Sequence, residues 1–155
     1  MPAFTIAELK RELARAKGNG LFEYARNAAA ANGLELAWLL GLWSRETNIT
    51  NVVGDNNHGH GPGQVDDRSH MIPGSLLELC NLSGKIAKEA LDFASVNYPH
   101  YVGDQRLKIA SDDYNAGPRG VRRGMAVGNV DAGSTGHDYG SDVVKRTAVF
   151  RRLLA

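Results

Sequence analysis

The chain has 155 residues, a formal net charge of +1 and an ordinary share of hydrophobic residues. This length and composition predict one soluble globular domain over residues 1–155, and the near-neutral charge gives no indication of nucleic-acid binding. The single cysteine, Cys80, excludes an intramolecular disulfide, and its leucine neighbours predict a thiol buried in the core.

The N-terminus lacks the apolar run of a signal peptide, and the apolar stretch 28–43 is too short and too interrupted to cross a bilayer. We therefore expect no membrane insertion. This pattern fits a cytoplasmic protein. It also fits a protein that is released by lysis, exported by another route or cut from a longer precursor.

Start and stop signals for helices divide the first third of the chain. Thr5 and Glu8 have the spacing of a capping box, and the glycines after residue 17 end that helix. Asn32 and Gly33 form a C-terminal signal for the next helix. The predicted helices cover residues 5–17, 21–31 and 33–46, and we describe residues 1–33 as N-terminal helices ahead of the region 34–155.

Residues 47–74 lack a helical period and are rich in glycine, asparagine and aspartate, which predicts a loop with short strands at 50–53 and 63–65. Ser75 and Glu78 then form a second capping-box pattern. The later predicted helices cover 75–96 with a break near Ser83–Gly84, 104–117 with Asp104 as its cap, 120–127 and 138–154. The whole pattern predicts a predominantly helical α+β fold with a small irregular β region.

The last predicted helix is amphipathic. Its apolar residues are expected to face the core, and its basic residues to face the solvent. The inward set is Val143, Val144, Ala148 and Leu153, and the outward set is Lys145, Arg146, Arg151 and Arg152.

Glu46 lies on the apolar face of the third helix. It follows Trp43 by three residues and Leu39 by seven, so the three side chains share one stripe. A carboxyl group placed there loses water, which raises its pKa and suits it to donate a proton. The alternative is a glutamate at a helix end that turns outward and pairs with Arg45.

Two aspartates of the following glycine-rich loop, Asp55 and Asp66, can face Glu46 across a cleft. Carboxyl groups on opposite sides of a substrate are the arrangement of acid–base hydrolysis. The alternatives are an Asx turn at Asp55 and a loop-capping role for Asp66, although Asp67 suits loop capping better.

Several motifs, in the same order along the chain, resemble those of the goose-type lysozymes, within the wider lysozyme and lytic transglycosylase superfamily. The resemblance covers residues 28–155, with its core in 34–155. The motifs are Ser44-Arg45-Glu46, Gly54-Asp55, Gln64-Val65-Asp66-x-Arg68-x-His70, Tyr114-Asn115-Ala116-Gly117, and the C-terminal Val130-Asp131-Ala132-Gly133-Ser134-Thr135, His137-Asp138-Tyr139 and Asp142-Val143-Val144.

The resemblance implies a lysozyme-like fold whose β region lies beside an active-site cleft. It implies hydrolysis of peptidoglycan glycan strands between N-acetylmuramic acid and N-acetylglucosamine, with Glu46 as general acid. Asp55 and Asp66 would place the attacking water, giving inversion. Substrate-binding roles are implied for Gln64, His70, Tyr114 and Asn115. The alternative for Gln64 and His70 is ordering of the loop, and the alternative for Tyr114 and Asn115 is a helix end at which the tyrosine packs and the asparagine caps. We expect a monomer of bacterial or phage origin that needs no cofactor and no metal.

The chain also departs from the family pattern. Pro62 and Gly63 stand where the family has a bulkier apolar pair, His60 stands where an aromatic residue is usual, and residues 46–55 form a shorter segment. These differences concern the sugar subsites more than the catalytic carboxyl groups.

Other functions fit parts of the same sequence. A lytic transglycosylase would use Glu46 for both proton transfers, and a non-catalytic glycan-binding module would keep only the cleft. His58, His60 and His70 beside the aspartates could hold zinc in a metal-dependent hydrolase, although the spacing is unfamiliar. A basic cluster after the Tyr114 motif is either a solvated face or a contact for anionic wall polymer; it comprises Arg119, Arg122 and Arg123.

Overall fold

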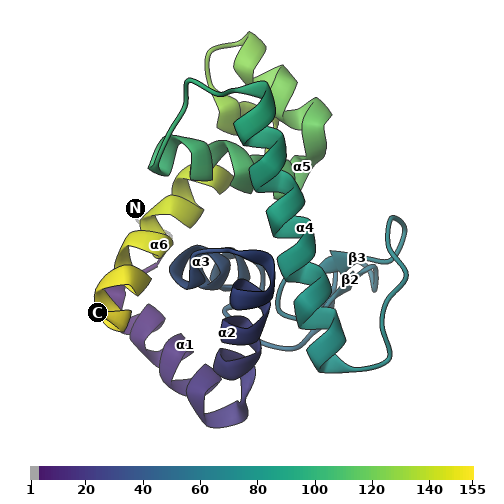
Figure 1. The fold of residues 1–155 in the computed structure, drawn as a ribbon, viewed down its shortest axis with the longest axis vertical. Helices are drawn as coiled ribbons and strands as arrows, with labels where there is room; N and C mark the ends of the chain where they lie inside the picture. Colours follow the sequence, from purple (N-terminus) through teal and green to yellow (C-terminus); the bar gives the residue numbers. More distant parts are fainter. Residues whose placement is uncertain (1–3) are drawn as a thin grey trace.

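The computed structural model describes residues 4–155, so the first three residues of the domain expected over 1–155 lie outside the described part. Within it, helices form most of the molecule and three short strands form a hairpin-like extension at one side (Figure 1). The α-helices are α1 (Ile6–Asn19), α2 (Leu21–Asn32), α3 (Leu36–Thr47), α4 (Leu76–Asn97), α5 (Asp104–Ala126) and α6 (Tyr139–Leu154).

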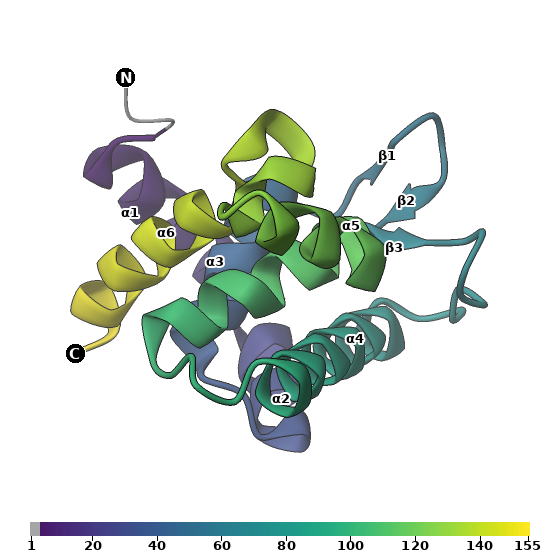
Figure 2. The same ribbon diagram turned by 90° about the horizontal axis from the view of Figure 1, so that it is seen from above.

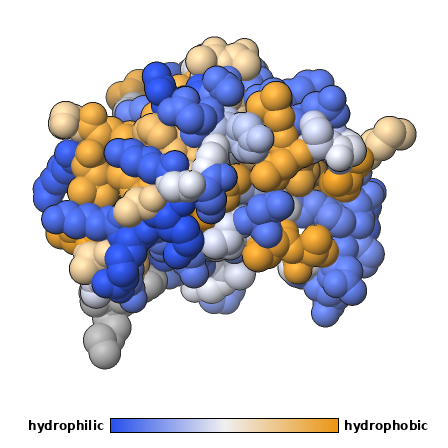
Figure 3. All heavy atoms as spheres, turned by 90° about the horizontal axis from the view of Figure 1, so that it is seen from below, coloured by the Kyte–Doolittle hydropathy of each residue, from blue (hydrophilic) through white to orange (hydrophobic). Residues whose placement is uncertain are grey.

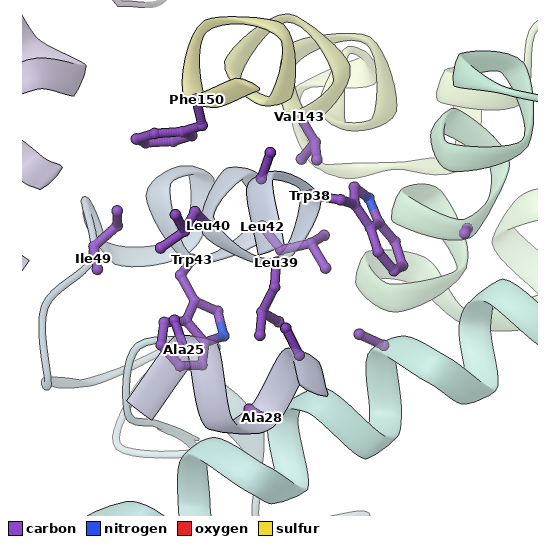
Figure 4. Packing of buried hydrophobic residues seen from close by; sticks show 14 of the residues in the cluster. Ala25, Ala28, Trp38, Leu39, Leu40, Leu42, Trp43, Ile49, Val143 and Phe150 are labelled. Carbon is purple, nitrogen blue, oxygen red and sulfur yellow. The ribbon is translucent and has the colours of Figure 1, made fainter. Parts of the chain in front are cut away.

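The central helix is α3, which packs between α2 and α6 (Figure 4). Every residue from 37 to 44 is buried, so the helix is enclosed on all sides and not only along the predicted stripe. A Cβ atom added at Gly41 would lie 2.6 Å from Thr147 Oγ1, so glycine permits the close crossing of α3 and α6. The end of α3, which carries Glu46, is therefore held rigidly.

The predicted N-terminal capping box is confirmed. The Thr5 hydroxyl accepts a hydrogen bond from Glu8 N at 3.2 Å, and a Glu8 carboxylate oxygen accepts one from Thr5 N at 2.6 Å. Gly33 ends α2 in the left-handed conformation, as the sequence signal predicted. One hydrophobic cluster includes buried side chains from all six α-helices, with Cys80 among them, and burial raises the pKa of the Cys80 thiol to about 12.

The β region is an antiparallel sheet of three strands, in the order β1 (Val53–Gly54), β2 (Gly59–His60) and β3 (Val65–Asp66). It projects from one side of the helical body, where β3 lies against α4 (Figure 1 and Figure 2). The strands predicted at 50–53 and 63–65 overlap β1 and β3 by one residue each, and β2 was not predicted. Strands of two residues show too little alternation to fix their ends.

Two details of the predicted helices are wrong. There is no break in α4 at Ser83–Gly84, because Gly84 serves a close approach to α2: an added Cβ would lie 3.2 Å from Ala28 Cβ. The position before α5 is occupied by Gly103, and Asp104 is the first helical residue, where it binds Arg151 at 3.0 Å. The predicted stop at Gly117 is confirmed as a kink with φ 70°, although the helix resumes at once through Ala126.

The predicted loop 128–136 contains two 3-10 turns, Val130–Gly133 and Thr135–His137, which lead into α6. The prediction for Arg146 is wrong: its side chain is buried, while Arg152 is exposed as expected. Burial is possible because Arg146 Nε binds Asp142 at 2.7 Å and its guanidinium also binds Ser44 Oγ at 2.8 Å.

Over the face seen from below, patches of hydrophobic residues are separated by hydrophilic ones (Figure 3). The large exposed apolar side chains, such as Met71 and Val96, come from separate elements. Among residues 4–155, no helix has both the length and the apolar character that a bilayer crossing requires.

Candidate active site

A cleft of about 770 Å³ lies where the end of α3, the β region and α5 meet. Glu46 comes from α3, Asp55 and Asp66 from the β region, and Tyr114 and Asn115 from α5. The structure therefore brings together the residues predicted from separate motifs, since Gln64 and His70 also line this cleft.

Glu46 is half-buried at the cleft and is bound by a tyrosine. The hydroxyl of Tyr139, the first residue of α6, donates a hydrogen bond to Glu46 Oε1 at 2.5 Å. Burial raises the pKa of the Glu46 carboxyl to about 7, while the Tyr139 hydrogen bond and the Arg45 charge oppose that rise. A carboxyl group with this pKa holds its proton near neutral pH, as a general acid must.

The alternative ion pair between Arg45 and Glu46 is not formed. Arg45 instead binds Asp138 at 2.9 Å and Asp142 at 3.0 Å, and its guanidinium lies 5.3 Å from the centre of the Tyr139 ring. Arg45 thus fixes the start of α6, which places the Tyr139 hydroxyl against Glu46.

A pair of buried carboxyl groups also anchors the start of α6. Gly140 N donates hydrogen bonds to Asp112 Oδ1 at 2.8 Å and to Asp131 Oδ1 at 2.9 Å. Burial and the neighbouring Asp131 raise the pKa of Asp112 to about 8, so at neutral pH one of the two groups is protonated and like-charge repulsion is avoided. Tyr139, adjacent to Gly140, is held in place by this anchor.

Asp55 and Asp66 are both bound by one arginine. Arg68 binds Asp55 Oδ2 at 2.8 Å and Asp66 Oδ2 at 2.8 Å, and its backbone N–H donates to Asp66 Oδ1 at 2.8 Å. These hydrogen bonds lower the pKa of Asp66 to about 2. Asp66 therefore stays ionised at pH values where Glu46 is protonated.

The loop histidines bind a carboxylate outside the candidate catalytic set. His58 Nδ1 and His60 Nε2 lie 2.8 Å and 2.9 Å from the two carboxylate oxygens of Asp67. Asp67 thus orders the loop, which is the role that suited it best from sequence. Within the described range 4–155, no group of three His, Cys, Asp or Glu side chains could hold a metal ion.

Gln64 orders the β region from inside the cleft. Its side-chain amide donates to Val52 O at 3.1 Å and to Gly61 O at 2.9 Å. An added Cβ atom at Gly54 would lie 2.6 Å from Gln64 Oε1, so glycine there leaves room for this side chain. These contacts agree with the loop-ordering role of Gln64, and its sugar-binding role stays a prediction.

Tyr114 ends a chain of buried hydrogen bonds that begins on α3. Trp43 Nε1 donates to Ser83 Oγ at 2.9 Å, Ser83 Oγ lies 2.9 Å from the Tyr114 hydroxyl, and that hydroxyl donates to Gly63 O at 2.6 Å. An added Cβ at Gly63 would lie 2.6 Å from the tyrosine oxygen. The departure from a bulkier residue at this position therefore has a steric reason.

Asn115 and His70 are placed differently along the cleft. Asn115 binds Thr135 twice, through Nδ2 to Oγ1 at 3.1 Å and from Thr135 N to Oδ1 at 2.8 Å, so it ties α5 to the loop before α6. His70 Nδ1 is buried and has no hydrogen-bond partner in the described part of the chain. The amide of Asn115 is therefore already engaged, and the substrate-binding role of His70 stays a prediction.

Two functional residues were missed as site residues from sequence. Tyr139 and Arg68 both lie within motifs that resemble the family. Nothing in their local sequence, however, shows that Tyr139 contacts Glu46 or that Arg68 contacts the two aspartates. The signals that could have found them were the motif positions themselves, His137-Asp138-Tyr139 and Asp66-x-Arg68.

The comparison with known protein families covers most of the chain, including the segments that line the cleft. The model of the family described as Lysozyme g matches residues 17–153. The chain belongs to the lysozyme g family. The predicted family is thereby confirmed, whereas the bacterial or phage origin stays a prediction.

Three similar curated proteins are described as lysozyme g. That of Struthio camelus is 33% identical over 122 residues, which cover 75% of this chain and 58% of the relative. That of Gallus gallus is 30% identical over 125 residues, covering 77% and 58%. That of Cyprinus carpio is 29% identical over 142 residues, covering 88% and 75%. The chain thus spans little more than half the length of the bird relatives that it matches.

Proposed function

We propose that this chain is a muramidase that hydrolyses the β-1,4 bond between N-acetylmuramic acid and N-acetylglucosamine in peptidoglycan glycan strands. The observation that carries the proposal is the separation of two carboxyl pKa values in one cleft, about 7 for Glu46 and about 2 for Asp66. Such a separation assigns the acid to the first group and the ionised partner to the second. The lysozyme g relatives supply the class of substrate.

Glu46 gives its proton to the glycosidic oxygen as the bond to the muramic acid C1 breaks. Positive charge develops on the sugar ring, and the ionised Asp66 stabilises it from the β region. Because Arg68 makes Asp66 a weak base, Asp66 orients the attacking water, and Asp55 accepts the proton that this water loses. We expect the chain to act as a monomer.

The positions of the carboxyl groups on the fold support single displacement with inversion. Glu46 ends a rigid helix, while Asp55 and Asp66 lie on the β region and are fixed by Arg68 rather than by Glu46. Inverting glycosidases place a water between the carboxyl group that acts as base and the sugar. The rival transglycosylase would use the muramyl 6-hydroxyl in place of that water.

The products test this mechanism. We expect mass spectrometry of digested peptidoglycan to show reducing muramic acid ends, with inverted configuration in the first product formed. A non-catalytic glycan-binding module would leave the turbidity of a wall suspension unchanged. Predominant 1,6-anhydro ends would establish the transglycosylase and refute hydrolysis.

Substitution of the two aspartates tests how they share the water. Asp55→Asn and Asp66→Asn should each reduce the rate less than Glu46→Gln does, because Arg68 still fixes the remaining aspartate. The double variant should be slower than either single one. The matched control is Asp92→Asn, which removes the charge of an exposed aspartate on α4. A double variant as active as either single one would refute this sharing, and one as active as the wild type would remove both aspartates from the mechanism.

The pH dependence of kcat/KM should follow the protonation of Glu46. Because the protonated form is the active one, the rate should fall as pH rises through about 7. The Tyr139 hydrogen bond favours the charged form, so Tyr139→Phe should move this alkaline limb to higher pH. The measurement is the pH profile of kcat/KM on soluble wall fragments. If the alkaline limb of the Tyr139→Phe variant lies at the same pH as that of the wild type, Tyr139 does not affect the protonation of Glu46.

A further inference from the structure

Asp113 lines the same cleft but has no role in the mechanism above. It stands on α5, directly before Tyr114, and its side chain is half-buried. Its Oδ1 atom is fully buried and has no hydrogen-bond partner among residues 4–155. A buried acceptor without a partner has lost its hydrogen bonds to water and has formed none in the protein, which costs free energy.

The other charged side chains of the cleft each have a partner. Glu46 binds Tyr139, and Arg68 binds both loop aspartates. Arg45 binds the carboxylates that flank the start of α6. The charged side chains that line the cleft in the described structure are Arg45, Glu46, Asp55, Asp66, Arg68 and Asp113. Of these, only Asp113 forms neither an ion pair nor a hydrogen bond.

The surroundings of Asp113 leave its charge largely uncompensated. Burial raises the pKa of the Asp113 carboxyl to about 6, and Arg122 opposes that rise without contacting it. The group is therefore mostly ionised at neutral pH. The side chain as a whole is only half-buried and lines the cleft, so a ligand would meet the accessible part of the carboxylate and not the buried Oδ1. A neutral donor such as a hydroxyl would leave its charge unbalanced, whereas a cation would bind it and balance the charge. An ammonium group has three donors and no acceptor, which complements a carboxylate that only accepts.

We propose that Asp113 forms an ammonium-binding subsite of the glycan cleft, which takes a primary amine carried by the wall polymer. This rests on the proposed function, because it assumes that the cleft holds wall glycan. Two parts of that polymer can present the group: an amino sugar that lacks its acetyl group, and the free amine of a peptide branch on muramic acid. Both offer the same ammonium chemistry to Asp113.

The test measures binding with Glu46→Gln in the background, so that no probe is cleaved. The sugar arm compares the N-acetylglucosamine tetramer with its fully deacetylated counterpart by titration calorimetry at pH 6.5, where Asp113 is mostly ionised and more of the sugar amine is protonated. The peptide arm compares a muramyl peptide with a free side-chain amine with the same peptide after acetylation of that amine. Each arm is repeated with Asp113→Asn and with Asp92→Asn, the matched charge removal outside the cleft.

We expect Asp113→Asn to reduce the preference for the free amine about tenfold or more in one arm, as for a hydrogen bond to a charged group. Asp92→Asn should leave the preference within twofold. The arm that responds identifies the source of the amine. Preferences that Asp113→Asn leaves unchanged in both arms would overturn the subsite alone. Absence of binding to every probe, with no wall hydrolysis by the wild-type chain, would overturn the proposed function with it.

Discussion

Glu46→Gln is expected to reduce the rate of wall hydrolysis by about 10²–10⁴-fold, the usual contribution of a general acid or base. The amide keeps the size of the side chain, and its oxygen can still accept the Tyr139 hydrogen bond. It cannot, however, give a proton to the leaving oxygen. The measurement is the initial rate on purified peptidoglycan, with Glu23→Gln on the exposed surface of α2 as the control.

A loss of activity through unfolding is excluded by a stability measurement. The pKa of Glu46 is raised from 4.5 to about 7 by folding, so its contribution to stability is present below pH 4.5 and is lost as pH rises through 7. At pH 8 the variant should therefore be at least as stable as the wild type, because it has no charge to desolvate. Activity within a few-fold of wild type would remove Glu46 from the mechanism.

Arg146→Met is expected to destabilise the fold by about 3 kcal/mol, because it removes the cation beside the buried Glu12, while Asp142 keeps its ion pair with Arg45. Arg146 is buried between Asp142 and Ser44, and the Ser44 hydroxyl donates to Glu12 at 2.5 Å. Burial already raises the pKa of Glu12, and the Arg146 charge is one of the effects that lower it. For a chain of this size the loss corresponds to a Tm lower by roughly 10 °C.

The control and the rescue use the same helix and the same network. Arg152→Met removes an exposed arginine of α6 and should change stability by no more than about 0.5 kcal/mol. Combining Arg146→Met with Glu12→Gln should recover part of the loss, since the buried glutamate charge is then gone as well. Differential scanning calorimetry at pH 7 measures all of these variants. Equal Tm values for the two arginine variants would show that the buried network contributes nothing.

The sequence by itself determined the helices and the position of the acid. Thr5 with Glu8, and Gly33, mark helix ends through contacts a few residues apart, and those contacts form whatever the rest of the chain does. The spacing of Glu46 from Trp43 placed the carboxyl group on a buried face, which is where its raised pKa originates. Each of these features depends on neighbours within one or two helical turns.

The local sequence pattern predicted the burial of Arg146 and the end of a helix at Gly84 less well. Arg146 occupies a position that an amphipathic pattern assigns to solvent, and the structure buries it because Asp142 and Ser44 satisfy its guanidinium. Gly84 looks like a helix stop in sequence, yet α4 continues because α2 approaches there. In both cases a partner on another part of the fold outweighs the local signal.

Only the tertiary structure decided how the site is assembled. Tyr139 meets Glu46 across 93 residues of sequence, Arg68 joins Asp55 to Asp66 across the β region, and Asp113 is left without a partner in the described cleft. Such contacts depend on how rigid elements pack, and the burial and charge that they create set the pKa values. The sequence could therefore name the acid, while the packing of α6 and the β region against α3 determined its environment.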